Sequence, residues 1–172
     1  SGEDIHRGHG NANSLLGRFM AEAGKRFTYG ISAVKGGTYR LAIPREARAD
    51  LSLAASDYGK LVQLTEELQA VFREELQQTS SLLKITVEEI PLAGTQVSPD
   101  KIVTLLLLAP DGICQMNEVL TGLVDTSDNL GELHMDGREF RMVFEIRSAQ
   151  DSLKYYIYEK IQRLSSLVGA KC

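Results

Sequence analysis

The chain has no tryptophan, only two cysteines and only three histidines among its 172 residues, and these shortages narrow its chemistry. Cys114 and Cys172 lie far apart and form no C-x-x-C pair, so neither a disulfide framework nor a cysteine zinc site is indicated. Two free thiols suit a reducing compartment, and we expect a cytoplasmic protein. A zinc centre or a nucleophilic triad would have to draw on the imidazoles of His6, His9 and His134.

Long hydrophobic runs and an excess of positive charge are also missing. The longest apolar run, residues 102–109, is far shorter than the roughly 20 residues that cross a bilayer, so we expect no membrane partner. The net charge of −4 would repel a phosphate backbone, and we expect no nucleic-acid partner. Hydrophobic residues at 43% are instead typical of a packed globular domain.

Periodic apolar residues predict four helices. One stripe follows Asn11 and Asn13, either of which can cap the helix, and Gly24 ends it. The most regular stripe predicts a long helix from Ser56-Asp57 to about Thr79-Ser80. Two further helices are expected, a short and mostly buried one over 99–109 and the last one over 151–168.

Alternating apolar residues predict five strands. Asp136-Gly137 is the strongest hairpin signal, with both residues expected at turn positions that require positive φ. The strand after it places Phe140 and Ile146 on a core face and Arg147 on the opposite face. The expected strands are 27–33, 47–53, 83–87, 133–135 and 138–147.

This order of elements predicts an α+β fold, a two-layer sandwich with helices on one face of an antiparallel sheet. Residues 11–55 and 98–148 each read as a helix followed by two strands. Duplication of a ferredoxin-like unit would explain this repeated order, and so would the small number of element orders that sandwich folds use.

Complete catalytic constellations are not evident in this sequence. No serine sits on a strand-turn-helix elbow, and Gly36-Gly37-Thr38 lacks the lysine of a phosphate-binding loop. His6 and His9 would share a face only in a helix, which the glycines beside them oppose, so an edge segment is the alternative to a metal site there. His134 is expected to face solvent near the hairpin tip.

Arg147 is the polar residue that stands out. At the end of a strand, on the face opposite the core row, a planar guanidinium can bind a carboxylate through two parallel hydrogen bonds. The alternative is an ordinary surface arginine, paired with Asp151 or with neighbours of Glu145.

Four segments carry a resemblance that extends, in order, over essentially the whole chain. They are SGEDIHRGHGNAN at 1–13, GGTYRLAIPREA at 36–47, TSDNLG at 126–131 and IRSAQDS at 146–152. Together they resemble the lid, or dimerisation, domain of bacterial aminoacyl-histidine dipeptidases. These Xaa-His dipeptidases are co-catalytic zinc metallopeptidases related to carnosinases. Because the chain begins without an initiator Met inside the first segment, we expect residues 1–172 to be a lid domain excised from a larger metallopeptidase.

The resemblance implies that the parent protein hydrolyses aminoacyl-histidine or other short dipeptides. A catalytic domain absent from this chain would bind two zinc ions, with a glutamate activating the bridging water. The lid would cover the active site and carry a homodimer contact, so the expected partners are a dipeptide substrate, the parent catalytic domain and a second copy. No catalytic or metal-binding residue is expected in this chain, which alone should be inactive.

The same resemblance assigns site residues by position. Arg147 matches the lid arginine expected to bind the C-terminal carboxylate of the substrate. Asn129 lies in the 126–131 motif, where substrate contact and plain turn structure are both open. The family usually has Asn in place of Leu41, and a leucine cannot donate a hydrogen bond. The alternative function is a stand-alone α+β interaction or ligand-sensing module without catalysis, since a fold does not determine a function.

Overall fold

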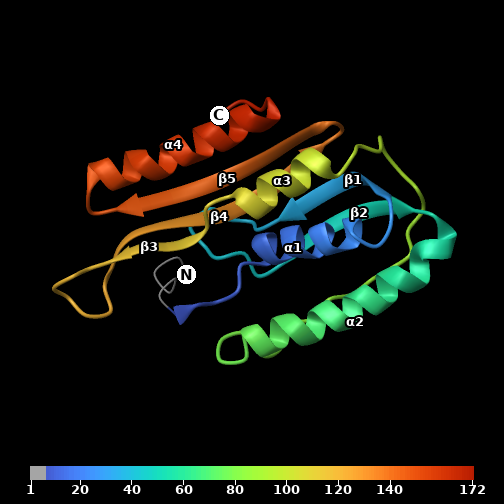
Figure 1. Ribbon diagram of the computed structural model, residues 1–172, viewed down its shortest axis with the longest axis horizontal. Coiled ribbons are helices and arrows are strands. Elements are labelled where there is room, and N and C mark those ends of the chain that lie inside the picture. The colour runs from blue at the N-terminus through green and yellow to red at the C-terminus, as the bar shows by residue number, and fades with distance from the viewer. Residues whose placement is uncertain (1–6) are drawn as a thin grey trace.

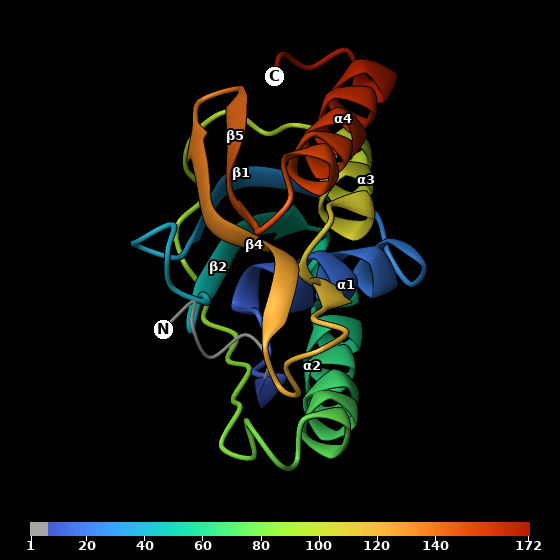
Figure 2. The same ribbon diagram turned by 90° about the vertical axis from the view of Figure 1, so that its left-hand side faces the viewer.

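The computed structural model describes residues 7–172, which form a sheet layer and a helix layer (Figure 1). Figure 2 shows the helices gathered on one side of the strands, so the expected α+β two-layer sandwich is confirmed. A short 3-10 turn, Ala55–Asp57, precedes α2. Within residues 7–172 the four α-helices and five strands are α1 (Ala12–Gly24), β1 (Tyr29–Gly36), β2 (Ala47–Leu53), α2 (Tyr58–Glu75), α3 (Asp100–Leu108), β3 (Gly112–Met116), β4 (Val124–Asp136), β5 (Glu139–Ser148) and α4 (Asp151–Val168).

The strands make one antiparallel sheet centred on β4. One edge of β4 pairs with β5, and its other edge pairs with β3 near the start and with β1 near the end. The β1–β4 pairing joins Lys35 to His134 and Gly36 to Leu133. On its other side β1 pairs with β2.

The two halves of the chain repeat one order of elements, helix, strand, strand, helix. The first half is α1-β1-β2-α2 and the second is α3-β4-β5-α4, with β3 added before β4. Their first strands pair with each other, and their first helices, α1 and α3, are in contact. This symmetric placement about the centre of the sheet is what duplication of one unit would produce.

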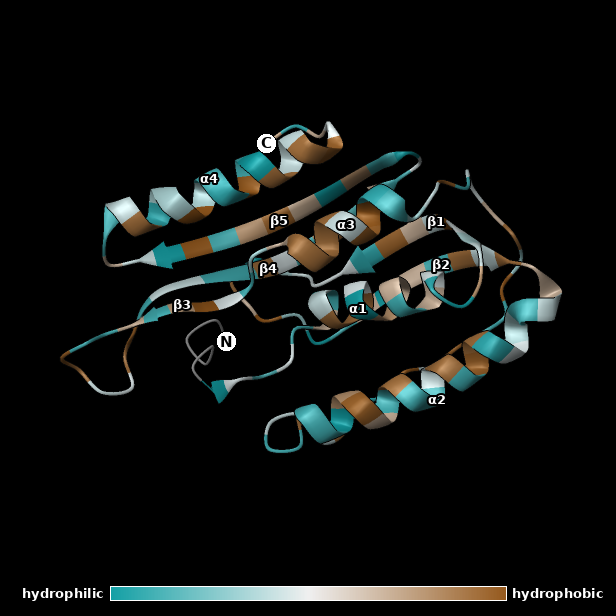
Figure 3. Cartoon of the chain, viewed as in Figure 1, coloured by the Kyte–Doolittle hydropathy of each residue, from teal (hydrophilic) through white to brown (hydrophobic). Residues whose placement is uncertain are grey.

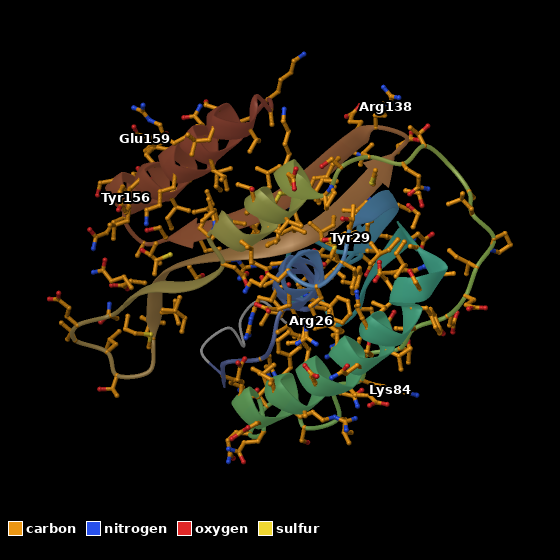
Figure 4. The ribbon with its side chains drawn as sticks, turned by 45° about the vertical axis from the view of Figure 1, so that its right-hand side comes forward. Arg26, Tyr29, Lys84, Arg138, Tyr156 and Glu159 are labelled. Carbon is orange, nitrogen blue, oxygen red and sulfur yellow. The ribbon has the colours of Figure 1, made fainter. Side chains whose placement is uncertain are left out.

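The core lies between the sheet and the helices. Tyr29 contributes its ring to this core while its hydroxyl donates to the carbonyl of Met20 at 2.7 Å. Burial raises the pKa of Tyr29 to about 12. Figure 4 shows Tyr29 in the interior, beside α1. The other buried members include Phe19, Met20 and Ala23 of α1, Ile31 of β1, Leu61 and Leu64 of α2, Ile102 and Leu106 of α3, and Leu130 and Leu133 of β4.

Hydropathy follows this layering except in α3 (Figure 3). Helices α2 and α4 alternate polar and apolar residues, as expected of helices with one face in water. The expectation that α3 is mostly buried is wrong, because Leu107 and Leu108 are 48% and 60% exposed while Ile102 and Leu106 are buried. No helix within residues 7–172 is long and apolar enough to cross a membrane.

Several expected elements differ from the structure, among them the strand expected at 133–135, which begins at Val124. Residues 83–87 do not form a strand, although Ile85 and Val87 pack against the core as their alternation predicts. The amide of Ile85 donates to Oε1 of Gln69 on α2 at 2.9 Å, so a side chain takes the place of a partner strand. Strand β3 was not expected at all, and α2 ends at Glu75, before the predicted Thr79-Ser80.

The predicted hairpin exists, but its turn is shifted by one residue. Asp136 pairs with Glu139, which leaves Gly137 and Arg138 as the two turn residues. Gly137 has a φ of 56°, and no non-glycine residue of the described chain has a positive φ. Glycine at the first turn position is typical of a type II′ turn, so the predicted placement of Asp136-Gly137 at both positions is wrong.

Candidate functional site

The open face of the sheet, opposite the helices, carries a row of polar side chains on β4 and β5. Ser127 pairs in register with Arg147, and Asn129 with Glu145. Directly opposed residues of an antiparallel pair project on the same side, and so do residues two apart on one strand. These four side chains therefore share one face. The core residue Leu130 lies on the other face.

Side chains take the place of a strand along the edge of β4 between β3 and β1. In this gap the amide of Leu130 donates to Oδ1 of Asp111 at 3.1 Å, and its carbonyl accepts from Nδ2 of Asn11 at 3.1 Å and Nδ2 of Asn13 at 3.0 Å. Asn11 also caps α1, since its Oδ1 accepts from the amide of Asn13 at 2.9 Å. The start of α1 is thereby held against the edge of β4.

Asp111 completes this arrangement at the start of α1. Its residue surface is exposed, but donors surround its carboxylate: the amide of Leu130, Nδ2 of Asn11 at 2.9 Å and Oγ of Ser14 at 2.8 Å. Burial of the carboxyl group raises its pKa, and the three hydrogen bonds oppose that rise. Asp111 therefore acts as an acceptor that ties α1 to β4.

The loop between β1 and β2, residues 37–46, is held over the polar row by Asn129. Nδ2 of Asn129 donates to the carbonyls of Arg40 at 2.7 Å and Ala42 at 3.0 Å, which uses both of its amide hydrogens. Leu41 stands between these two carbonyls and is half-buried. Asn129 thus fixes the turn that carries Leu41.

Arg147 is exposed at the end of this row, and it makes no side-chain hydrogen bond or ion pair with the part of the chain that the structure describes. The pairing with Asp151 that the sequence left open is not formed. A guanidinium in this state is available to a carboxylate from outside the domain.

Two carboxylates on the same face as Arg147 are bonded to other residues. Glu145, two residues away on β5, accepts from Nε of Arg40 at 3.2 Å. Asp125, two residues from Ser127 on β4, accepts from Nδ2 of Asn117 at 2.9 Å. Both acids therefore have partners other than Arg147.

A shallow hollow of about 220 Å³ opens beside this row. Ile113 of β3 pairs in register with Ser127, so the hollow lies on the same face of the sheet as Arg147. Its lining includes His9, Asn11, Ile43, Asp111, Ile113 and Asn129. The structure therefore brings both predicted site residues, Arg147 and Asn129, to one face of the sheet, where Asn129 lines the hollow. Substrate binding by either residue stays a prediction.

Asp128 is a notable residue that the sequence did not single out. It is fully buried, its Oδ1 accepts from the amide of Asn129 at 2.9 Å, and its Oδ2 has no hydrogen-bond partner. Burial raises the pKa of Asp128 to about 7, and the nearby charges of Asp111 and Glu145 add to the rise. The sequence signal is an aspartate two positions before the core residue Leu130, in phase with it, and this signal is weak because charged residues usually lie outside the core.

The two histidines that the structure describes, His9 and His134, do not belong to a group of metal ligands. His9 lies at the hollow, with Nδ1 3.3 Å from the carbonyl of Thr79, and His134 contacts Oε2 of Glu132 at 2.8 Å. His6 lies outside the described residues, so the alternatives stated for it stay open. Within residues 7–172 no three His, Cys, Asp or Glu side chains are grouped so that they could hold a metal ion. Zinc therefore does not fit the described part of this chain.

The sequence and the fold of this chain are similar to those of known proteins. Residues 1–80 match the family described as the peptidase dimerisation domain. The chain is similar to the cytosol non-specific dipeptidase of Escherichia coli (strain K12), with 34% identity over 174 residues that include 99% of this chain. It is also similar to the crystal structure of the aminoacylhistidine dipeptidase from Vibrio alginolyticus, with 30% identity and a TM-score of 0.90 over 98% of this chain.

The chain spans only about a third of the length of these relatives, 36% of the Escherichia coli protein and 35% of the Vibrio alginolyticus chain. The similarity nevertheless runs through both repeats, beyond the 80 residues that the family match includes. It therefore concerns the whole two-layer sandwich.

Proposed function

Because the chain is a dimerisation domain of the type found in these dipeptidases, we propose that residues 1–172 form the lid domain of a peptidase that hydrolyses aminoacyl-histidine or other short dipeptides. The lid covers the active site with its open sheet face, which carries the polar row and the hollow beside it. Arg147 then binds the C-terminal carboxylate of the dipeptide.

The observation that carries this proposal is the state of Arg147. It is exposed on the open sheet face, and two acids of the same face, Glu145 and Asp125, are bonded to other residues. Guanidinium and carboxylate match in geometry, and two parallel hydrogen bonds between them recognise a free chain end. A dipeptide differs from a longer peptide in having that carboxylate one residue from the scissile bond.

Peptide hydrolysis itself belongs to a separate catalytic domain of the parent. The catalytic domain binds two zinc ions, whose chemistry is to activate a water molecule for attack on the peptide carbonyl. This chain contributes substrate binding only, and alone it hydrolyses no peptide. The name of the Escherichia coli relative, a cytosol dipeptidase, supports a cytoplasmic location for the parent.

A second copy of the protein binds at the outer edge of β5. The inner strands β1 and β4 pair with each other, which leaves the outer edges of β2 and β5 without a partner strand in residues 7–172. Helix α4 lies alongside β5 (Figure 1), and Tyr155, Tyr156 and Tyr158 are 65%, 55% and 42% exposed. Tyrosine is enriched in protein interfaces, so the β5–α4 side suits a homodimer contact.

Substitution of Arg147 in the full-length protein tests the carboxylate contact. We expect Arg147→Ala to raise KM roughly ten- to a hundredfold for dipeptides, the range expected for a lost charged hydrogen bond, with kcat changed less. Arg138→Ala, at the exposed hairpin tip in Figure 4, is the matched control. A substrate with a C-terminal amide should show little difference between wild type and Arg147→Ala. Equal dipeptide KM values for both proteins would contradict the proposal.

A further inference from the structure

Glu145 lies between two arginines on the open face. On one side Arg40 donates its Nε to Oε2 of Glu145 at 3.2 Å. On the other side Arg147 follows two residues later on the same strand and face. A glutamate side chain at this spacing can reach either cation, but its ion pair in the structure is with Arg40 only.

Two residues of β4, Asn129 and Gly131, hold the backbone of Arg40 in place. Nδ2 of Asn129 bonds its carbonyl at 2.7 Å, and Gly131 lies directly under it, since a Cβ at Gly131 would be 2.5 Å from the same oxygen. Gly37, with a φ of 65°, lets the start of the loop lie against the carbonyl of Gly131. The guanidinium of Arg40 therefore extends from a fixed point toward Glu145.

We propose that Arg40 is a positioning residue: it occupies Glu145, and so keeps Arg147 free to bind the substrate carboxylate. This inference rests on the proposed function of Arg147. If Arg40 were absent, Glu145 would lack its ion pair and stand two residues from Arg147 on the same face, and the substrate carboxylate would have to displace it. Arg40 thus acts on substrate affinity without touching the substrate.

Three variants of the full-length protein test this role. Arg40→Met removes the cation and keeps an unbranched side chain, and it should raise the dipeptide KM roughly two- to fivefold with kcat unchanged, because an exposed ion pair competes only weakly. Glu145→Gln removes the competitor and should leave KM at or below the wild-type value. The double variant Arg40→Met/Glu145→Gln should return KM to the Glu145→Gln value.

The matched control is Arg48→Met on β2. Arg48 bonds Asp50 at 2.7 Å and is about as exposed as Arg40, with side-chain exposures of 63% and 60%. Its loss should leave KM unchanged. Thermal unfolding of all variants should show similar midpoints, because exposed pairs contribute little to stability.

The outcomes separate this inference from the proposed function. If Arg147→Ala raises KM but Arg40→Met does not, the role of Arg40 is wrong while carboxylate binding stands. If Arg40→Met raises KM and Glu145→Gln fails to reverse it, Arg40 acts in some other way and the inference is also wrong. If Arg147→Ala leaves KM unchanged, the proposed function itself fails.

Discussion

Asp128 shows how one buried carboxyl group can govern the pH response of this domain. It is fully enclosed, with Oδ2 lacking any hydrogen bond and Asp111 and Glu145 nearby. Removing a carboxylate from water disfavours the charged form, which is why its pKa rises to about 7 from the ordinary value of 3.8. The neutral form is therefore the one that the fold accommodates.

Stability should consequently fall as this group ionises. Since its pKa is higher in the folded than in the unfolded chain, the stability it contributes is fully present below pH 3.8, declines above it, and is lost as the pH rises through about 7. Between pH 5 and pH 8, ionisation of Asp128 should lower the free energy of unfolding of the wild type by on the order of 2 kcal/mol. Asp128→Asn should remove this decrease. Urea unfolding at several pH values measures this. Asp136→Asn, at the exposed end of β4, is the control, and an identical pH slope in wild type and Asp128→Asn would contradict the prediction.

Gly131 is a second residue whose identity is dictated by its neighbours. A Cβ there would approach the backbone of Arg40 to 2.5 Å, and backbone cannot rotate away as a side-chain end can. We expect Gly131→Ala to displace the 37–46 loop and to lower the free energy of unfolding by roughly 1–3 kcal/mol. Gly59→Ala on α2, where an added Cβ meets nothing within 4 Å, should instead be neutral or stabilising by up to about 1 kcal/mol. Chemical denaturation compares the two, and equal effects would rule out the steric explanation.

Among the elements, β4 is the one whose partners change along its length. It pairs with β3, then with side chains, then with β1, while β5 follows its other edge throughout. The side-chain stretch depends on Asn11, which both caps α1 and bonds the carbonyl of Leu130. The amide group of Asn11 is therefore one of the links between helix and sheet, beside those of Asn13 and Asp111.

Two substitutions at Asn11 separate the cap from the contact with β4. Asn11→Ser keeps a good cap and removes the donor to Leu130, whereas Asn11→Ala removes both. We expect a loss of about 1 kcal/mol for the serine variant and about 2–3 kcal/mol for the alanine variant. Urea unfolding gives these values, and hydrogen exchange of the Leu130 amide should quicken in both. A serine variant as stable as wild type would show that the contact with β4 adds nothing.

For the whole molecule, the pairing of β1 with β4 places each half of the chain against the other. The inner strands β1 and β4 pair with each other, so the outer edges of β2 and β5 and the outer helices α2 and α4 are left for further contacts. Tyr156 and Glu159 project from the outer surface of α4 in Figure 4, with Tyr155 also exposed there. This side offers more aromatic surface than a typical solvated helix.

The homodimer proposal predicts a specific sensitivity at α4. Tyr155→Ser should weaken self-association about tenfold or more, because interface tyrosines are frequent sites of high binding energy. Tyr39→Ser, which alters a tyrosine of similar exposure in the β1–β2 loop, should have no effect, since Tyr39 is 59% and Tyr155 is 65% exposed. Sedimentation equilibrium of the full-length protein measures the dissociation constants. Equal constants for the two variants would place the dimer contact elsewhere.

The sequence alone determined the features that depend on local periodicity. Spacings of three or four residues predict the apolar stripes of α1, α2 and α4. A spacing of two predicts the arms of the β4–β5 hairpin and puts Arg147 on the face opposite the core residues. Where a local signal was ambiguous, as in the alternation of 83–87, it correctly predicted burial but not the pairing partner.

Tertiary structure decided everything that depends on residues far apart in the chain. Arg147 is available because Glu145 is bonded to Arg40, which lies more than a hundred positions earlier in the chain. Asp128 is buried because β3, β5 and the helices pack around β4, although the sequence at the start of β4 resembles a polar loop. No short window of sequence contains both members of such contacts. Their geometry arises only when the two halves of the chain pack together at β1 and β4.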